Sequence, residues 1–283
     1  MNNGNGISIQ KSSGELEGFN ESKLRSSLQR AGANDEIANN IIEAVFEILE
    51  EGLNSQKIYN KAFQMLKQHS RPTAARYKLK KAIFELGPSG YPFERFIAEV
   101  LSFQGFKTTV GVVVEGNCVA HEVDVIAEKD QERYLVECKF HTSPKNYCSV
   151  QVPLYIYARF EDINRKYLHD TSKNKKYNQG WIYTNTRFSP DALQYGKCVG
   201  LNLISWNYPE VGNLKERIEL ARLHPISCLT TLNRKEKQLL FKQSVVLCKQ
   251  LLDDEQLLDF LVLNQKKKKG IMDEVKGLLS PLN

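Results

Sequence analysis

Hydrophobic residues recur every three or four positions through most of the first 86 residues. This spacing is typical of amphipathic helices, with one apolar face each. The expected helices cover residues 24–31, 37–49, 58–66 and 74–86. Two short stretches of alternating residues, 7–11 and 15–19, come first and predict a pair of strands joined by a turn at 12–14. The pattern therefore predicts a helical domain that opens with a hairpin.

Residues 87–92, GPSGYP, hold two glycines and two prolines in six positions and cannot continue a helix. After them, apolar spacing predicts a helix over 93–103 and another over 150–164. Apolar or alternating runs predict strands at 107–114, 119–127, 134–140, 180–184 and 201–206. This order is that of an α/β or α+β domain, and we expect the α/β class, with a mixed sheet flanked by helices.

From residue 211 onward the pattern is helical again and ends in a polar, lysine-rich stretch. Helices are expected over 229–240 and 246–258, with Ser244 at the turn between them. The pair is similar to a helix-hairpin-helix DNA-binding unit, although the usual hairpin glycine is absent. The run Lys266–Lys269 either contacts phosphates or forms a solvated tail. Three domains are thus predicted, at 1–87, 88–210 and 211–283.

Composition places the 283-residue chain among folded proteins. Hydrophobic residues make up 41% and charged residues 25%, which excludes a disordered chain, a fibre and a small disulfide scaffold. The net charge of +6 permits a nucleic-acid partner. No apolar run reaches about 18 residues, and the start lacks the apolar core of a secretory signal. The six cysteines are spread thinly, so reduced thiols and a cytoplasmic location are expected.

The candidate chemistry lies on two neighbouring predicted strands. Side chains alternate along a strand, so several charged positions fall on one face. They are Glu122, Asp124, Glu137, Lys139 and His141. A hairpin would bring Asp124 close to Glu137 and Lys139, and Glu94 in the preceding helix supplies a further acid. A solvated sheet face with cross-strand ion pairs would give the same alternation. The strongly apolar neighbours of these acids favour a covered, functional cluster instead.

These residues carry a family resemblance. Asp124 followed by Glu137-Cys138-Lys139 resembles the motif of PD-(D/E)XK nucleases, and the helix from Phe93-Glu94 to Gly105-Phe106 is similar to the entry of Mrr-like restriction endonucleases. The resemblance covers residues 91–206. It implies a metal-dependent DNA endonuclease with a catalytic set of Glu94, Asp124, Glu137, Lys139 and Gln151. Val123 stands where a proline often precedes the aspartate, and many Mrr-like enzymes have Gln at the position of Glu137.

The chemistry suits those residue types. A carboxylate about 4 Å from a phosphate charge costs roughly 4 kcal/mol at an effective dielectric of 20, so the acids need a divalent ion to face DNA. The oxygen ligands Asp124, Glu137 and the Cys138 carbonyl favour Mg²⁺ or Mn²⁺. Lys139 would orient or deprotonate the water and stabilise developing charge. Gln151 and His141 are expected to support the ligands or contact the phosphate.

A zinc site is the rival interpretation of the same strands. Cys118-x-x-His121 and Cys138-x-x-His141 have zinc-like spacing. Strand periodicity opposes it, because side chains three positions apart on a strand point to opposite faces. Buried apolar cysteines are the simpler expectation.

The N-terminal region resembles an ATP-cone. The resemblance rests on Lys11 and Gly14 in the hairpin, on the stretch from Phe19-Asn20 to Lys23-Leu24, and on Ala75-Arg76-Tyr77 at the end. It implies that ATP or dATP binds as an effector, with contacts from Lys11, Glu17 and Lys23. Lysines and the start of a helix are suitable partners for phosphates. The chain has no Walker loop, so the nucleotide is expected to be a signal and not a fuel.

These observations predict a nucleotide-regulated, metal-dependent DNA endonuclease, and family analogy suggests defence against foreign DNA. One alternative is a nucleotide-sensing DNA-binding regulator with an inactive nuclease fold, and another is a nuclease that acts on RNA. Cutting both strands needs two active sites, so a homodimer or larger assembly is expected.

Overall fold

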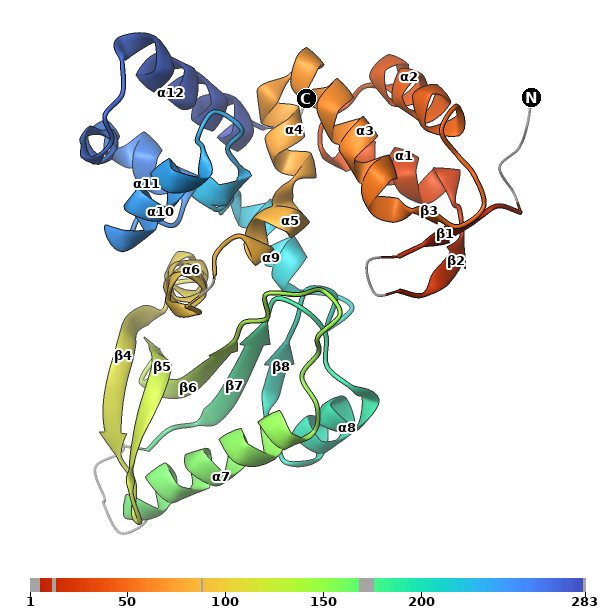
Figure 1. The fold of residues 1–283 in the computed structure, drawn as a ribbon. Helices are drawn as coiled ribbons and strands as arrows, with labels where there is room; N and C mark the ends of the chain where they lie inside the picture. Colours follow the sequence, from red (N-terminus) through yellow and green to blue (C-terminus); the bar gives the residue numbers. More distant parts are fainter. Residues whose placement is uncertain (1–5, 12–13, 88, 168–175, 282–283) are drawn as a thin grey trace. The chain divides into compact units, whose positions relative to one another are not determined.

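The computed structural model describes residues 6–11, 14–87, 89–167 and 176–281 (Figure 1). Tertiary contacts group the chain into two compact units. The first unit joins Met1–Ala82 with His224–Asn283, and the second is Ile83–Leu223. The two ends of the chain thus build one unit, and its middle builds the other. We call them the terminal unit and the central unit.

The terminal unit opens with the predicted hairpin, whose turn residues 12 and 13 lie outside the described residues. Its three strands are β1 (Ser8–Gln10), β2 (Leu16–Gly18) and β3 (Leu53–Asn54), and its first helices are α1 (Glu21–Arg30), α2 (Asp35–Phe46), α3 (Ser55–His69), α4 (Arg71–Tyr77) and α5 (Leu79–Phe84). Strand β3 was not predicted, and it pairs with β1 in parallel. Asn20, Asn34 and Asn54 cap the first three helices by accepting hydrogen bonds from backbone N–H groups.

The single helix predicted over 74–86 is two helices. Ser70 caps α4, so that helix begins at Arg71, earlier than expected. The chain then breaks at Lys78, whose side chain is buried and donates to the Ser227 carbonyl at 2.7 Å. The apolar faces of these helices form a common core, which includes Leu28, Ile41, Val45, Ala62 and Leu66.

The C-terminal part of the terminal unit is more finely divided than predicted. Its elements are η1 (Ile226–Cys228), α10 (Arg234–Lys242), α11 (Cys248–Asp253), η2 (Glu255–Phe260) and α12 (Gln265–Leu279). The expected helices over 229–240 and 246–258 are therefore shorter and differently placed. Ser244 takes a left-handed conformation, with φ at 59°, where a hairpin glycine would be usual. The predicted lysine-rich tail is the start of α12.

This C-terminal part packs on α4 of the N-terminal part. Gly277 allows close approach, because a Cβ there would lie 2.5 Å from Cγ of Pro72. Arg76 donates to the last carbonyls of α12, at 2.5 Å to Gly277 and 3.2 Å to Leu278. These bonds satisfy acceptors that the end of a helix leaves open.

The central unit is built on a five-stranded sheet in the order β4-β5-β6-β7-β8. Its elements are α6 (Tyr91–Phe103), β4 (Lys107–Glu115), β5 (Ala120–Lys129), β6 (Glu132–Lys139), α7 (Gln151–Lys166), β7 (Gln179–Thr184), α8 (Pro190–Cys198), β8 (Asn202–Ile204) and α9 (Leu214–Ala221). Strands β4 to β6 are antiparallel, and β6 to β8 are parallel. This arrangement confirms the predicted mixed sheet.

Helices cover both sides of this sheet. Figure 1 shows α6 on one side and α7 with α8 on the other. Ile156 of α7 packs with Ile182 of β7 and Leu203 of β8 in one buried cluster. The chain thereby places the β5–β6 hairpin at the centre of a covered sheet, as its apolar strands predict.

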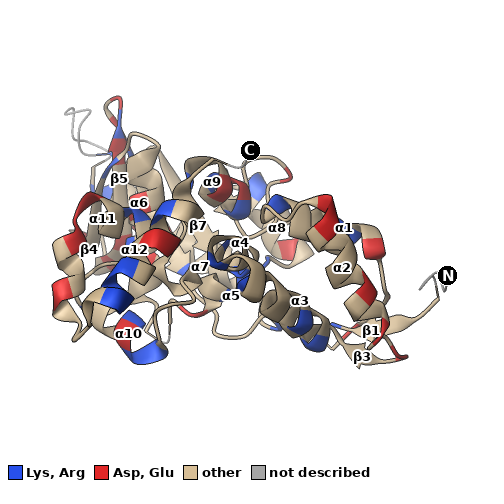
Figure 2. Cartoon of the chain, turned by 90° about the horizontal axis from the view of Figure 1, so that it is seen from above, with Lys and Arg blue, Asp and Glu red and all other residues tan. Residues whose placement is uncertain are grey.

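The cysteines, the lengths of the apolar helices and the surface charges also bear on the expectations from the sequence. All six cysteines are free thiols, as expected. No described helix is both long and apolar enough to cross a membrane. Charges of both signs are interspersed on α10 and α12, as Figure 2 shows.

Candidate active site and nucleotide site

The sheet opens at Asp124. Strands β5 and β6 pair as far as Val125 and Val136, and the same register would next set Asp124 across from Glu137. That pair does not form. Strand β6 instead continues beside β7, with Glu137 paired to Ile182. A carboxylate at such an opening projects from a strand that has lost its neighbour on that side.

The other neighbour of Asp124 is also interrupted. Val110 pairs with Val125, and Val112 pairs with Val123, which leaves Gly111 across from Asp124 without a ladder pair. Gly111 has φ at 66°, and a Cβ there would meet nothing within 4 Å. Glycine adopts this left-handed conformation at no steric cost, and it leaves space beside the aspartate.

The backbone of β6 orients Asp124. The Cys138 amide N donates to Oδ2 of Asp124 at 2.7 Å. This bond ties the aspartate to the strand that carries Glu137 and Lys139. The predicted proximity of the Asp124, Glu137 and Lys139 positions is therefore present in the fold.

Acidic side chains crowd this opening. Burial raises the pKa of Glu137 to about 7, and the charge of Asp124 is the next cause. Glu94, in the first turn of α6, has its pKa raised to about 7 by burial and then by Asp124, Glu122 and Glu137. The pKa of Asp124 is also raised, mainly by burial. Burial, and secondly the neighbouring carboxylates, thus disfavour the charged form of these acids.

An arginine that the sequence analysis missed partly balances these acids. Nη1 of Arg159 lies 2.8 Å from Oε2 of Glu137, and the two side chains are only 13% and 18% exposed. Arg159 follows Gln151 and Tyr155 at four-residue spacing, which places all three on one face of α7. That spacing was the signal that could have revealed it.

Aromatic and polar contacts fix the end of β6. Phe140 packs against Phe93 of α6, with ring centroids 5.6 Å apart. A Cβ at Gly87 would lie 2.3 Å from the Phe140 ring, so the boundary glycine is required by packing. Thr184 Oγ1 donates to the Lys139 carbonyl at 2.8 Å. Both helix α6 and strand β7 thereby hold the Lys139 backbone.

The zinc arrangement considered above is not formed. His121 Nε2 lies 2.7 Å from Oδ2 of Asp162, whereas His141 Nε2 lies 3.5 Å from Cys148 Sγ. Among the described residues, no three His, Cys, Asp or Glu side chains are arranged to hold one metal ion. Each pair is divided between a strand and the segment beside it: Cys118 precedes β5 and is exposed, whereas Cys138 is buried in β6 and His141 follows that strand.

The predicted magnesium ligands are of a different kind. They need only the two carboxylates of Asp124 and Glu137 and the Cys138 carbonyl oxygen. Oxygen donors are those that Mg²⁺ and Mn²⁺ prefer. Acids whose pKa values are raised by burial and by neighbouring carboxylates would be stabilised in their charged form by a cation between them. The donor set therefore fits a hard divalent ion.

The remaining predicted residues of this site lie at its rim. Lys139 ends β6 and is exposed. Gln151 is the first residue of α7 and is also exposed. His141 is tied through its backbone to the side chain of Asn185, which accepts from its N–H and donates to its carbonyl, both at 2.8 Å. Burial and Lys139 lower the pKa of His141, which favours a neutral imidazole.

In the terminal unit, the three residues expected to contact a nucleotide form one cluster. Lys11 forms an ion pair with Glu17 of β2, and Lys23 Nζ lies 2.5 Å from Oε1 of the same glutamate. The Lys23 amide N, at the start of α1, donates to the capping Asn20 at 2.8 Å. Two lysines thus share one acid at the mouth of the hairpin.

Comparisons with known proteins agree with this organisation. The ATP cone domain matches residues 7–81, the restriction endonuclease (Mrr catalytic) family matches 87–211, and the AF1548-like C-terminal domain matches 224–279. The first two matches confirm the predicted ATP-cone and Mrr-like domains. The helix-hairpin-helix resemblance of the C-terminal region stays a prediction.

Two similar proteins extend across domain boundaries. An uncharacterized protein from Archaeoglobus fulgidus is 36% identical over 184 residues, which are 65% of this chain and 99% of that protein. The crystal structure of AF1548, a protein of unknown function, is 35% identical, has a TM-score of 0.56, and corresponds to 68% of this chain and 98% of its own.

Proposed function

From the premise that the chain belongs to the AF1548-like family, we propose that it is a metal-dependent DNA endonuclease regulated by ATP or dATP. Its restriction endonuclease and ATP-cone domains support a nuclease with nucleotide-binding regulation. We propose that it acts in the cytoplasm, where the free thiols would stay reduced, and that its role is defence against foreign DNA.

One observation carries the proposal. Glu94, Asp124 and Glu137 come from a helix and two strands near the point where the sheet opens, and burial is the main cause that raises the pKa of each, with the charge of Asp124 adding to the shifts of the other two. A fold gains no stability from crowding buried acids, since desolvation and repulsion both oppose it. Such a cluster is typical of a functional site.

The chain's own residues have distinct parts in this proposal. Asp124, Glu137 and the Cys138 carbonyl would hold Mg²⁺ or Mn²⁺, which would neutralise phosphate charge and activate water. Lys139, exposed at the rim, stabilises negative charge that develops on the phosphate. Arg159 holds Glu137 in place through their 2.8 Å contact. Gln151, the first residue of α7, would contact the substrate.

Regulation rests on the terminal unit. Lys11, Glu17 and Lys23 form the cluster that the ATP-cone resemblance assigns to nucleotide contacts. A bound triphosphate would compete with Glu17 for both lysines, because phosphate oxygens offer the same charge-assisted bonds. Nucleotide binding would thereby change the contacts between the hairpin and α1.

An inactive nuclease fold is the second candidate, and the Arg159–Glu137 pair favours it. A guanidinium bound to a metal-ligating carboxylate would weaken its affinity for a cation. In that case the protein would bind DNA under nucleotide control without cutting it.

Cleavage of supercoiled and linear DNA in Mg²⁺ or Mn²⁺ tests the proposal, with and without ATP and dATP. We expect metal-dependent cutting that Asp124→Asn abolishes and that a nucleotide changes. An RNA substrate in parallel tests the preference for DNA, and sedimentation with DNA tests the expected dimer. DNA binding without cutting in every condition would favour the inactive regulator instead.

A further inference from the structure

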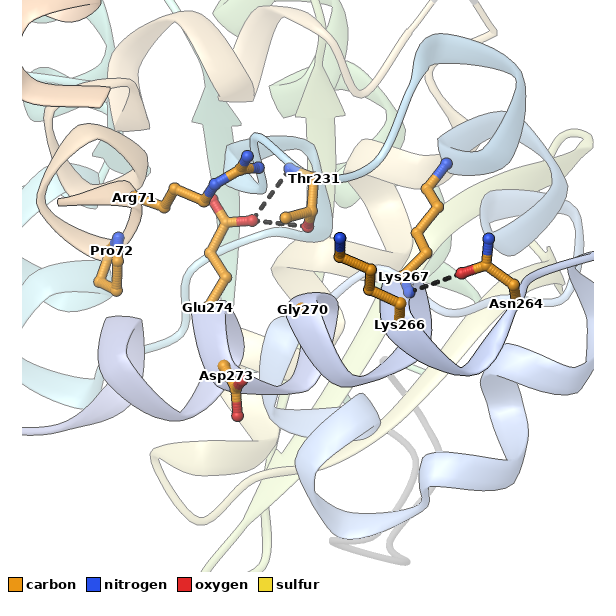
Figure 3. Close-up of a pocket in the computed structure, with 9 residues that line it drawn as sticks. All are labelled: Arg71, Pro72, Thr231, Asn264, Lys266, Lys267, Gly270, Asp273 and Glu274. Atoms are coloured by element: carbon orange, nitrogen blue, oxygen red, sulfur yellow. Dashed lines mark hydrogen bonds between the residues drawn. The ribbon is translucent and has the colours of Figure 1, made fainter. Parts of the chain in front are cut away.

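A cavity of about 650 Å³ opens in the terminal unit between α12, the start of α4 and the segment that leads into α10 (Figure 3). It is built from residues other than the Lys11–Glu17–Lys23 cluster. Arg71 lines one side, and Lys266 and Gly270 line the other. Its volume is within the range of about 300–1,000 Å³ that is common for small-molecule pockets.

Two glycines of α12 explain the shape of this cavity. Gly277 brings the helix against Pro72, since a Cβ there would lie 2.5 Å from Cγ of Pro72. Gly270 lies seven residues earlier, on the same face of the helix, and a Cβ there would meet nothing within 4 Å. Glycine in a helix interior weakens the helix relative to alanine. At Gly270 no neighbouring atom of the protein requires it, and its effect is to keep the cavity open.

The cavity presents two cations that the protein does not neutralise. Arg71 and Lys266 are exposed, and no hydrogen bond or ion pair engages either side chain within the described part of the chain. The neighbouring Lys267 differs, because it forms an ion pair with Glu236 of α10. Figure 3 shows Arg71 and Lys266 on either side of the same hollow.

Two acids, Asp273 and Glu274, also line the cavity, and neither forms an ion pair with Arg71 or Lys266 among the described residues. Glu274 is 2% exposed, and it accepts hydrogen bonds from the Thr230 N–H at 2.7 Å, the Thr231 N–H at 2.9 Å and the Thr231 hydroxyl at 2.6 Å. Asp273 is exposed and points away from Arg71 and Lys266 in Figure 3. The Glu274 carboxylate is therefore bound by three neutral donors and forms no ion pair with Arg71 or Lys266 among the described residues.

We infer that this cavity binds the phosphate groups of a small phosphorylated ligand. Arg71 and Lys266 would each form charge-assisted bonds to phosphate oxygens, Arg71 with its planar fork and Lys266 as a point charge. The hollow above Gly270 would receive the rest of the ligand. This would be a second phosphate-binding site, separate from the nucleotide contacts proposed for the hairpin.

Isothermal titration calorimetry of the full chain with inorganic tripolyphosphate tests this inference. The double substitution Lys11→Glu with Lys23→Glu is introduced first to abolish phosphate binding at the Lys11–Glu17–Lys23 cluster. Binding at the cavity is then measured alone. We expect one remaining site per chain, and we expect its affinity to fall as ionic strength rises.

Two variants and a matched control assign that site. Arg71→Ala with Lys266→Ala should weaken tripolyphosphate binding at least tenfold. Gly270→Leu should weaken it similarly without changing any charge, because the side chain enters space that is open in the fold. Lys269→Ala removes the same charge from an exposed position of the same helix that does not line the cavity, and it should bind as before.

Equal affinity in the Arg71/Lys266 variant and the Lys269 control would overturn the inference, as would absence of any remaining site in the starting protein. A short DNA duplex forms the second arm. If the Arg71/Lys266 variant lost affinity for DNA and kept its affinity for tripolyphosphate, the ligand would be nucleic acid and the inference of a small ligand would be wrong. Circular dichroism of each variant verifies that it is folded.

Discussion

The two charge clusters of this protein differ in burial and in balance. In the central unit, Asp124 and Glu137 are largely covered, and burial is the main cause that raises the pKa of each, with a further contribution from Glu122 at Asp124 and from Asp124 at Glu137. In the terminal unit, Lys11 and Lys23 are 43% and 70% exposed and share Glu17 between them. Acidic groups outnumber basic groups in the first cluster, and basic groups outnumber the acid in the second.

This difference indicates what each cluster can accept. The buried acids would gain most from a cation, because a low-dielectric site strengthens electrostatic attraction. The exposed lysines would gain from an anion, and they can exchange Glu17 for it at low cost because solvent already screens the pair. Under the proposed function, the first cluster would take a metal ion and the second a phosphate group, in separate units.

The largest expected effect tests the buried cluster. Asp124→Asn should reduce metal-dependent DNA cleavage by at least about a hundredfold, because it removes the acid at the opening of the sheet and leaves a side chain of the same shape. Gel assays of plasmid cleavage measure it. Glu128→Gln is the control, since that acid lies four residues along the same strand and pairs with Arg133. Similar losses in both variants would remove Asp124 from the site.

The next effect tests the exposed cluster. Lys11→Glu with Lys23→Glu should weaken ATP or dATP binding at least tenfold, since three acids would then face the phosphates. Basal cleavage should stay unchanged. Calorimetry measures the affinity, with Lys67→Glu in the exposed last turn of α3 as the control. Unchanged nucleotide affinity would contradict the assignment.

A smaller effect is the pH dependence of folding stability that Glu137 causes. The pKa of Glu137 is raised in the folded state, so protonation favours folding and stability should fall as pH rises from about 4.5 to 7. Glu137→Gln should therefore stabilise the central unit by about 1–3 kcal/mol at pH 8 in EDTA and by little at pH 4.5. Mg²⁺ should reduce the difference at pH 8 by stabilising the parent protein.

Denaturant unfolding followed by tryptophan fluorescence measures this effect. Both tryptophans, Trp181 and Trp206, lie in the central unit, so the signal reports on the unit that holds Glu137. An equal stability difference at both pH values would show that charge is not the cause.

The smallest effect concerns packing in the terminal unit. Gly270→Ala should stabilise the protein by about 0.5–1 kcal/mol, because alanine favours the helix and its Cβ meets no neighbour. Gly277→Ala should destabilise it, since that Cβ would clash with Pro72. Thermal unfolding by circular dichroism compares the two. Stabilisation by both substitutions would contradict the close approach of α12 to α4.

Much of this organisation could be predicted from local sequence. The order of strands and helices in the central unit follows from apolar runs, and the placement of Asp124 near Glu137 follows from a short hairpin. The two-residue strand β3 could not be predicted, because alternation needs more than two positions. The break at Lys78 also escaped prediction, since it depends on a buried contact with Ser227, 149 residues away.

The missed parts of the site depend on tertiary structure in the same way. Arg159 reaches Glu137 only because α7 crosses the sheet, and Gly111 matters only through its register with Asp124. The cavity beside Arg71 joins residues almost 200 positions apart. Periodicity describes each element by itself, and it carries little information about which distant elements meet.

The assembly of one unit from both ends of the chain has a consequence for protein synthesis. The central unit ends at Leu223, whereas the terminal unit includes residues beyond His224. Chains are made from the N-terminus and domains generally fold as they emerge. A nascent chain therefore completes the sheet of the central unit before the ribosome has made α12, and the terminal unit can add α12 only after the central unit has been synthesised.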